Sequence, residues 1–165
     1  MNKKGFTLIE LLIVIAIIAI IAAVIFVALD PLKRFQDSRD STRWQEVTTI
    51  LEAIQVDQVD NGGGYITSVL NANVGSVYMI SDGANAVGCD DYNTYCDTDV
   101  SGDSYCVNLS GLVTEGYMGD VPVSPDGDGT WSENYTGYTL QKSSTGTITI
   151  RACESEGATE IEVLR

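Results

Sequence analysis

The residue with the clearest chemical consequence in this sequence is Glu10, a carboxylate next to a long apolar segment. Residues Leu11–Leu29 form an unbroken run of 19 apolar residues. A charged side chain at the centre of a bilayer costs at least about 2.5–3.5 kcal/mol, so such residues usually have a partner. A cut after Gly5 would create an amino group on Phe6, one helical turn from Glu10. The alternative is that Glu10 lies near the interface and simply reaches the lipid headgroups.

The order of residues around Gly5 is the reverse of an ordinary secretory signal, in which the small-residue cleavage site follows the apolar core. Here Gly5 lies between Lys3-Lys4 and the apolar run. A cut after Gly5 would remove the lysines and leave the apolar helix on the mature protein. That helix would span about 28 Å, close to the hydrocarbon core of a bilayer. The positive-inside rule keeps the lysines in the cytoplasm and sends the head out.

The N-terminal run also carries a family resemblance, in the residues Lys3-Lys4-Gly5-Phe6-Thr7-Leu8-Ile9-Glu10-Leu11-Leu12-Ile13-Val14. It closely resembles the class III leader and N-terminal helix of type IV pilins and type II secretion pseudopilins. The resemblance implies cleavage after Gly5 by a prepilin peptidase and N-methylation of Phe6. It implies that Glu10 is the carboxylate used in assembly, and that subunits leave the membrane to form a helical filament.

One position departs from the family pattern. Many members have a proline in the neighbourhood that Val27 and Ala28 occupy here, and the first proline of this chain is Pro31. Because proline removes a backbone donor and clashes with the preceding turn, we expect a kink around Pro31. Asp30 is a good N-cap and Pro31 a good first helical residue, so the helix is predicted to restart there.

The expected fold class is α+β: a long N-terminal helical spine packed against a small C-terminal antiparallel sheet, as in the pilin fold. The predicted parts are a leader (1–5), a hydrophobic transmembrane and assembly helix (6–30), an amphipathic continuation (31–61) and a globular head (62–165). In the continuation, helical spacing predicts one packing face, formed by Trp44, Val47, Ile50, Leu51 and Ile54. The polar remainder includes Arg39, Arg43, Glu46 and Glu52.

The head is predicted from alternation and turn residues. Residues 135–142 and 147–153 alternate like strands, and the Ser-Ser-Thr-Gly segment between them predicts a hairpin. Residues 160–164 are a further strand, and the short apolar stretch 77–80 is a strand or a helical turn. Residues 65–103 otherwise indicate a long loop, of the kind that in compact domains is usually functional or disordered.

The chain has four cysteines and no histidine. In an exported head, four cysteines normally form two disulfides, with three connectivities to choose from. The absence of histidine and of CxxC spacing argues against zinc. Because Cys153 lies in or beside a strand, it could reach Cys106, and we predict the pairs Cys106–Cys153 and Cys89–Cys96.

The segment Asp126-Gly127-Asp128-Gly129 is a candidate calcium site and the sole cofactor expectation. Two carboxylates at i and i+2 can face one cation, and Glu133, Asn134 or backbone carbonyls would complete the six to eight oxygens that calcium prefers. Some major pseudopilins, which the chain resembles, have a calcium site in a comparable loop. The alternative is that the Asp-Gly pairs are ordinary turn formers.

The acidic charge of the head argues against some classes of function. From Gln45 to Arg165 the chain holds 19 acidic and three basic residues. Such a head does not suit direct nucleic-acid binding, which needs Lys and Arg to neutralise phosphates. It fits a surface that stays soluble when many copies pack together. An anchored enzyme is disfavoured because there is no histidine and no nucleophile elbow, and among the scattered carboxylates no pair placed for hydrolysis stands out.

The predicted function is therefore a structural pilin of a type IV pilus, serving adhesion, motility or DNA uptake. The alternative is a pseudopilin of a type II secretion system. Expected partners are identical or related subunits, inner-membrane lipid before assembly, prepilin peptidase and the pilus assembly machinery. The expected location is a single-pass membrane protein with its head outside the cytoplasm, and then an extracellular pilus or a periplasmic pseudopilus.

Overall fold

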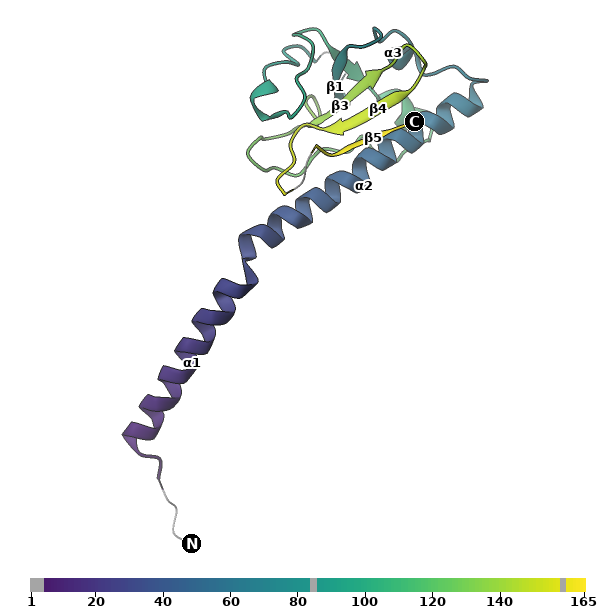
Figure 1. Ribbon diagram of the computed structural model, residues 1–165. Coiled ribbons are helices and arrows are strands. Elements are labelled where there is room, and N and C mark those ends of the chain that lie inside the picture. The colour runs from purple at the N-terminus through teal and green to yellow at the C-terminus, as the bar shows by residue number, and fades with distance from the viewer. Residues whose placement is uncertain (1–4, 84–85, 158–159) are drawn as a thin grey trace. The chain divides into compact units, whose positions relative to one another are not determined.

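The structure is a computed structural model that describes residues 5–83, 86–157 and 160–165 (Figure 1). Residues 1–35 and 36–165 form two compact units, each defined by the contacts among its own residues. In chain order the elements are α1 (Leu8–Leu29), α2 (Pro31–Asp60), α3 (Thr67–Leu70), β1 (Val77–Ser81), the 3-10 turn η1 (Asn93–Tyr95), β2 (Cys106–Asn108), α4 (Ser110–Thr114), β3 (Tyr138–Lys142), β4 (Ile148–Ala152) and β5 (Glu162–Leu164). The α+β class predicted from the sequence is confirmed.

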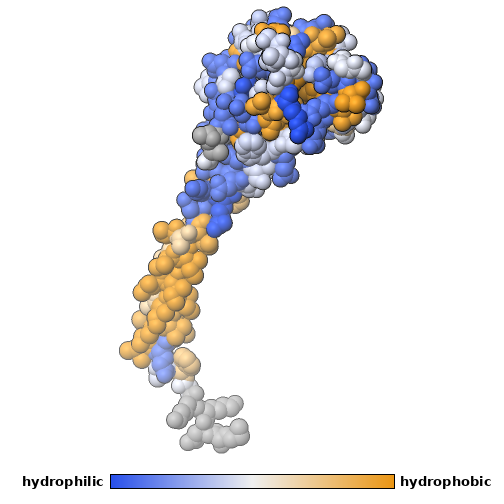
Figure 2. All heavy atoms as spheres, turned by 45° about the vertical axis from the view of Figure 1, so that its right-hand side comes forward, coloured by the Kyte–Doolittle hydropathy of each residue, from blue (hydrophilic) through white to orange (hydrophobic). Residues whose placement is uncertain are grey.

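Every residue of helix α1 from Leu11 to Leu29 is apolar and none is buried, and Figure 2 shows these apolar side chains along the face in view. A soluble helix normally has one polar face, and a helix that is hydrophobic all round needs a membrane or a protein interior. Within the described residues, one helical stretch, Leu8–Asp60, is long and apolar enough to cross a membrane by length and composition alone. Helix α1 is the first part of this stretch.

The helix is interrupted at Asp30, as predicted. Asp30 has φ 35° and ψ 73°, a left-handed conformation that ends α1. Its side-chain Oδ1 accepts a 3.5 Å hydrogen bond from the N–H of Lys33, and Pro31 is the first residue of α2. The guanidinium of Arg34 donates to the carbonyl of Leu29, which gives the C-terminus of α1 a polar partner.

The packing face of α2 agrees with the predicted stripe except at its first member. Four of the five predicted residues are buried: Val47, Ile50, Leu51 and Ile54. Trp44, in contrast, is 42% exposed, and its neighbour Arg43 is fully buried. The prediction for these two adjacent residues is therefore wrong, because Arg43 has several carboxylate partners in the head.

The sheet has the order β2-β1-β3-β4-β5 and is mixed. The predicted hairpin is confirmed: β3 and β4 pair antiparallel from Tyr138↔Ala152 to Lys142↔Ile148. The prediction of a purely antiparallel sheet is wrong for one strand pair, since β2 pairs parallel with β1 through Met79↔Cys106. Such parallel pairing needs a long crossover, which the segment between β1 and β2 provides. Helix α2 shares the main core with the sheet (Figure 1).

The cysteines pair differently from the prediction. Cys89 is bonded to Cys106, and Cys96 to Cys153. The long loop folds back so that the N–H groups of Gly88 and Cys89 both donate to the carbonyl of Asp103, which brings Cys89 beside the start of β2. Farther along, the N–H of Asp97 donates to the carbonyl of Cys153, which places Cys96 at the end of β4. Backbone contacts between distant segments thus decide the pairing.

Candidate functional site

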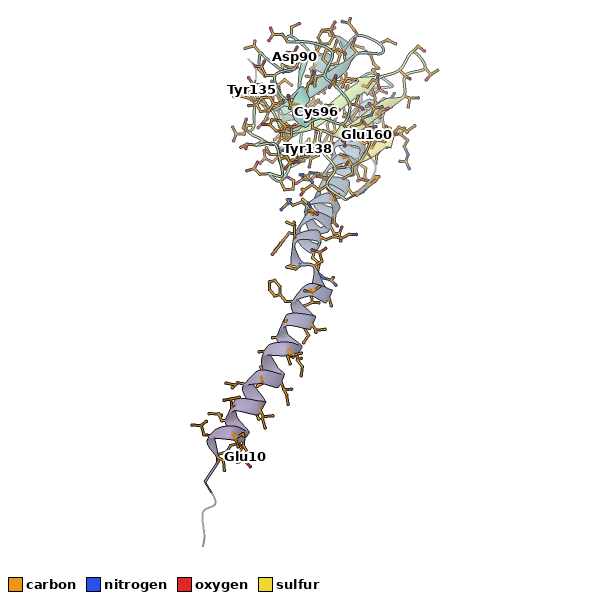
Figure 3. All side chains as sticks on the ribbon, turned by 60° about the vertical axis from the view of Figure 1, so that its left-hand side comes forward. Glu10, Asp90, Cys96, Tyr135, Tyr138 and Glu160 are labelled. Carbon is orange, nitrogen blue, oxygen red and sulfur yellow. A yellow bond between two sulfur atoms is a disulfide. The ribbon has the colours of Figure 1, made fainter. Side chains whose placement is uncertain are left out.

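The first candidate site is the N-terminus of α1, where Thr7 is the N-cap and Leu8 the first helical residue. The carboxylate of Glu10 lies at this end of the helix, as Figure 3 shows. Its Oε2 accepts hydrogen bonds of 2.8 Å from both the backbone N–H and the hydroxyl of Thr7. In return the Thr7 hydroxyl accepts a 3.3 Å bond from the N–H of Glu10. This reciprocal arrangement is a capping box.

The predicted cleavage and methylation residues lie just outside this cap. Gly5 and Phe6 are exposed and have no regular secondary structure, and Phe6 is 79% exposed. Lys3 and Lys4, which complete the predicted leader, lie outside the described residues. The structure thus places Gly5, Phe6 and Glu10 within one short segment and gives Glu10 a partner in its own chain.

A second polar site lies in the head around Arg43, whose side chain is fully buried. Its Nη1 donates to Asp40 at 2.8 Å and to Glu156 at 2.7 Å, and its Nη2 donates to Glu154. The remaining N–H groups donate to the Ser124 hydroxyl (Nε, 3.1 Å) and the Pro125 carbonyl (Nη2, 3.0 Å). All five N–H donors of the guanidinium therefore have an acceptor.

We call the charged residues of this site the Arg43 cluster; they are Arg39, Asp40, Arg43, Glu154 and Glu156. Arg39 adds a second guanidinium, which forms an ion pair with Glu156. Asp40 accepts hydrogen bonds from the N–H groups of Glu156 and Gly157. The cluster connects α2 to the segment after β4. The signal that could have indicated the cluster is helical spacing, because Arg43 lies on the same face of α2 as Val47 and Ile50.

The predicted calcium segment is attached to this cluster. The N–H groups of Asp128 and Gly129 donate to Oε2 of Glu154 at 3.1 and 3.0 Å, so the loop turns donors toward a carboxylate. A Cβ on Gly127 would lie 2.4 Å from Oε1 of Glu154, which explains the glycine. Oδ1 of Asp126 accepts a 3.0 Å bond from the N–H of Trp131.

Calcium binding by Asp126, Asp128 and Glu133 stays a prediction. Across residues 5–83, 86–157 and 160–165, no three His, Cys, Asp or Glu side chains are grouped so as to hold a metal ion. If the two aspartates bind calcium, millimolar Ca²⁺ should raise the melting temperature of the full chain in detergent by several degrees, since ligands of the native state stabilise it. The rise should vanish in Asp126→Asn/Asp128→Asn. An unchanged melting temperature in the unaltered chain would remove the idea.

Acid is expected to weaken the Arg43 cluster through Glu156. The hydrogen bond from Arg39, with a further bond from Arg43, holds the pKa of Glu156 below its ordinary value of 4.5. A carboxyl group with a lowered folded-state pKa stabilises the native state above its unfolded pKa, and this contribution disappears as the pH falls through the folded pKa. Between pH 5 and pH 3, urea unfolding should therefore show a steeper loss of stability for the wild type than for Glu156→Gln.

The matched control for this pH series is Glu133→Gln, which changes an exposed glutamate outside the cluster. It should lose stability with acid as steeply as the wild type. Equal slopes for the wild type and Glu156→Gln would contradict the assignment.

Together, a helix that is apolar beyond Glu10 and an α+β head give the chain a pilin-like architecture. Comparison with known proteins agrees with this architecture. Residues 1–26 match the family described as the prokaryotic N-terminal methylation motif. The chain therefore carries the class III prepilin leader of type IV pilins and pseudopilins. No curated protein and no solved structure matches the chain.

Proposed function

We propose that this chain is a structural subunit of a type IV pilus, anchored in the membrane before assembly and polymerised through its N-terminal helix. The observation that carries the proposal is the match of residues 1–26 to the N-terminal methylation motif, on a helix that is apolar on all sides. In a filament, the helices of neighbouring subunits would cover the apolar surface of α1. Such a filament serves adhesion, motility or DNA uptake.

Assembly would use a change of partner at Glu10. Before leader removal, Glu10 has its hydrogen bonds to Thr7. Hydrolysis after Gly5 turns the backbone nitrogen of Phe6 into a charged amine. If this amine meets the Glu10 carboxylate of a neighbouring subunit, the pair sets the axial register and offsets the cost of a carboxylate in an apolar environment.

The head supports a role at the cell surface. Two disulfides, Cys89–Cys106 and Cys96–Cys153, fix the long loop to β2 and to the end of β4. By constraining the unfolded chain, the Cys89–Cys106 disulfide, with a sequence separation of 17, contributes about 3 kcal/mol, and the Cys96–Cys153 disulfide, with a separation of 57, contributes about 4 kcal/mol. The acidic charge of the head, in turn, keeps many copies soluble at high local concentration. We therefore favour the pilus over the secretion pseudopilus, whose subunits carry the same leader.

Electron microscopy of sheared cell-surface material, combined with mass spectrometry of this chain, tests the proposal. We expect long filaments containing a chain that begins at N-methylated Phe6. A processed chain found only in the cell envelope, with loss of protein secretion in its deletion strain, would instead identify a pseudopilin. A chain that retains Met1 and stays in the membrane fraction would contradict assembly of either kind.

A further inference from the structure

The cap at Thr7 has a consequence for the peptide bond that precedes it. Thr7 has φ −84° and ψ 153°, an extended conformation, so the helix cannot include it. The bond between Gly5 and Phe6 therefore lies outside the helix, in an exposed segment only one residue before the cap. Both halves of the capping box, the Thr7 hydroxyl and the Glu10 carboxylate, keep the helix from starting earlier.

The position of the helix start matters for hydrolysis. A peptide bond inside a helix has its N–H and C=O groups engaged in the helical ladder, and exposed non-helical segments are the preferred sites of proteolytic cleavage. Apart from Thr7 and Glu10, residues 6–29 are apolar. An apolar environment favours a helix, because a helix satisfies its backbone polar groups internally. A helix that began one turn earlier would include the Gly5–Phe6 bond.

We propose that Thr7 is a positioning residue for leader removal: its N-cap holds the Gly5–Phe6 bond in an extended, accessible conformation. This inference rests on the proposed function, in which a prepilin peptidase cuts this bond. In the reaction, water adds across the amide, the C–N bond breaks, Gly5 leaves with a carboxylate and Phe6 keeps the amine. Thr7 takes no part in the bond changes and acts through the backbone conformation alone.

Three substitutions at Thr7 separate capping from recognition of its shape. Thr7→Val keeps the shape but has no acceptor for the N–H of Glu10. Thr7→Ser and Thr7→Asn change the shape but are good N-caps. The measurement is kcat/KM for cleavage of the full chain in detergent by purified prepilin peptidase, followed by mass spectrometry. The ¹³Cα chemical shifts of Phe6 and Thr7 report the helix start in the same samples.

We expect Thr7→Ser and Thr7→Asn to be cleaved within about two-fold of the wild type, and Thr7→Val about five-fold more slowly, the factor that a typical N-cap provides. The chemical shifts of Phe6 should move toward helical values only in Thr7→Val. Wild-type cleavage of Thr7→Val would overturn the inference, as would equal losses in Thr7→Val and Thr7→Asn. If the unaltered chain is not cleaved after Gly5 at all, the proposed function fails instead.

Discussion

Replacing Arg43 by methionine is expected to lower the free energy of unfolding of the head by about 3–5 kcal/mol, the usual cost of removing one partner from a buried ion pair. Methionine fills much of the same volume but donates no hydrogen bonds. Asp40 and Glu154 are both buried, and each would lose its bond to the guanidinium. Because a net stability of 5–15 kcal/mol is typical of domains, this loss is a large fraction of the total.

Urea unfolding of the full chain in detergent micelles, followed by tryptophan fluorescence, measures this effect. Trp131 is a suitable reporter because it is buried and its indole N–H lies 3.4 Å from Oε1 of Glu154. The matched control is Arg39→Met, which removes a partly exposed guanidinium whose partner is Glu156. We expect it to cost clearly less than Arg43→Met, since screening by water weakens exposed pairs.

Arg43→Lys should fall between the wild type and Arg43→Met, because an ammonium group keeps the charge but has neither the planar geometry nor the five donors of the guanidinium. A loss within about 0.5 kcal/mol for Arg43→Met would contradict the role assigned to the cluster, because that is the usual range of surface substitutions. Equal losses for the two arginine-to-methionine variants would show that burial is not what makes Arg43 important.

The second large effect is expected at Glu10. In Glu10→Gln, the side-chain amide can still occupy the third position of a capping box, so the helix start and leader removal should stay intact. It has no negative charge for the Phe6 amine of a neighbouring subunit. We therefore expect incorporation into filaments to fall at least about ten-fold, the equivalent of 1.4 kcal/mol. The readouts are the cleaved fraction by mass spectrometry and the amount of chain in sheared filaments.

Glu10→Ala is the companion variant. It loses the charge and one half of the capping box, but the Thr7 hydroxyl can still accept from the N–H of residue 10, as it does in the wild type. Cleavage should therefore continue while incorporation falls at least as far as in Glu10→Gln. Wild-type incorporation of Glu10→Gln would show that the charge is not used, whereas a loss confined to Glu10→Ala would assign the effect to the helix start.

Local features were predictable from the sequence because neighbouring residues cause them. The apolar run of α1 needs no information from the rest of the chain. Neither does the break at Asp30-Pro31, because proline has no N–H to continue the helical hydrogen bonds and Asp30 accepts a hydrogen bond from the N–H of Lys33. The β3–β4 hairpin follows from strand alternation and a short turn that places Tyr138 opposite Ala152. The N-terminal motif is also local, and it identified the family resemblance without a tertiary structure.

The features that the sequence could not determine all depend on residues far apart in the chain. The parallel pairing of β2, and the disulfides that join Cys89 to Cys106 and Cys96 to Cys153, follow from the course of one long loop. Helical periodicity predicted that Trp44 packs against the head and that Arg43 is exposed, because burying an apolar side chain is favourable and burying an unpaired charge is costly. The tertiary structure reversed this choice: it brings carboxylates from 111 and 113 residues away to Arg43, and they offset the cost of burying its charge.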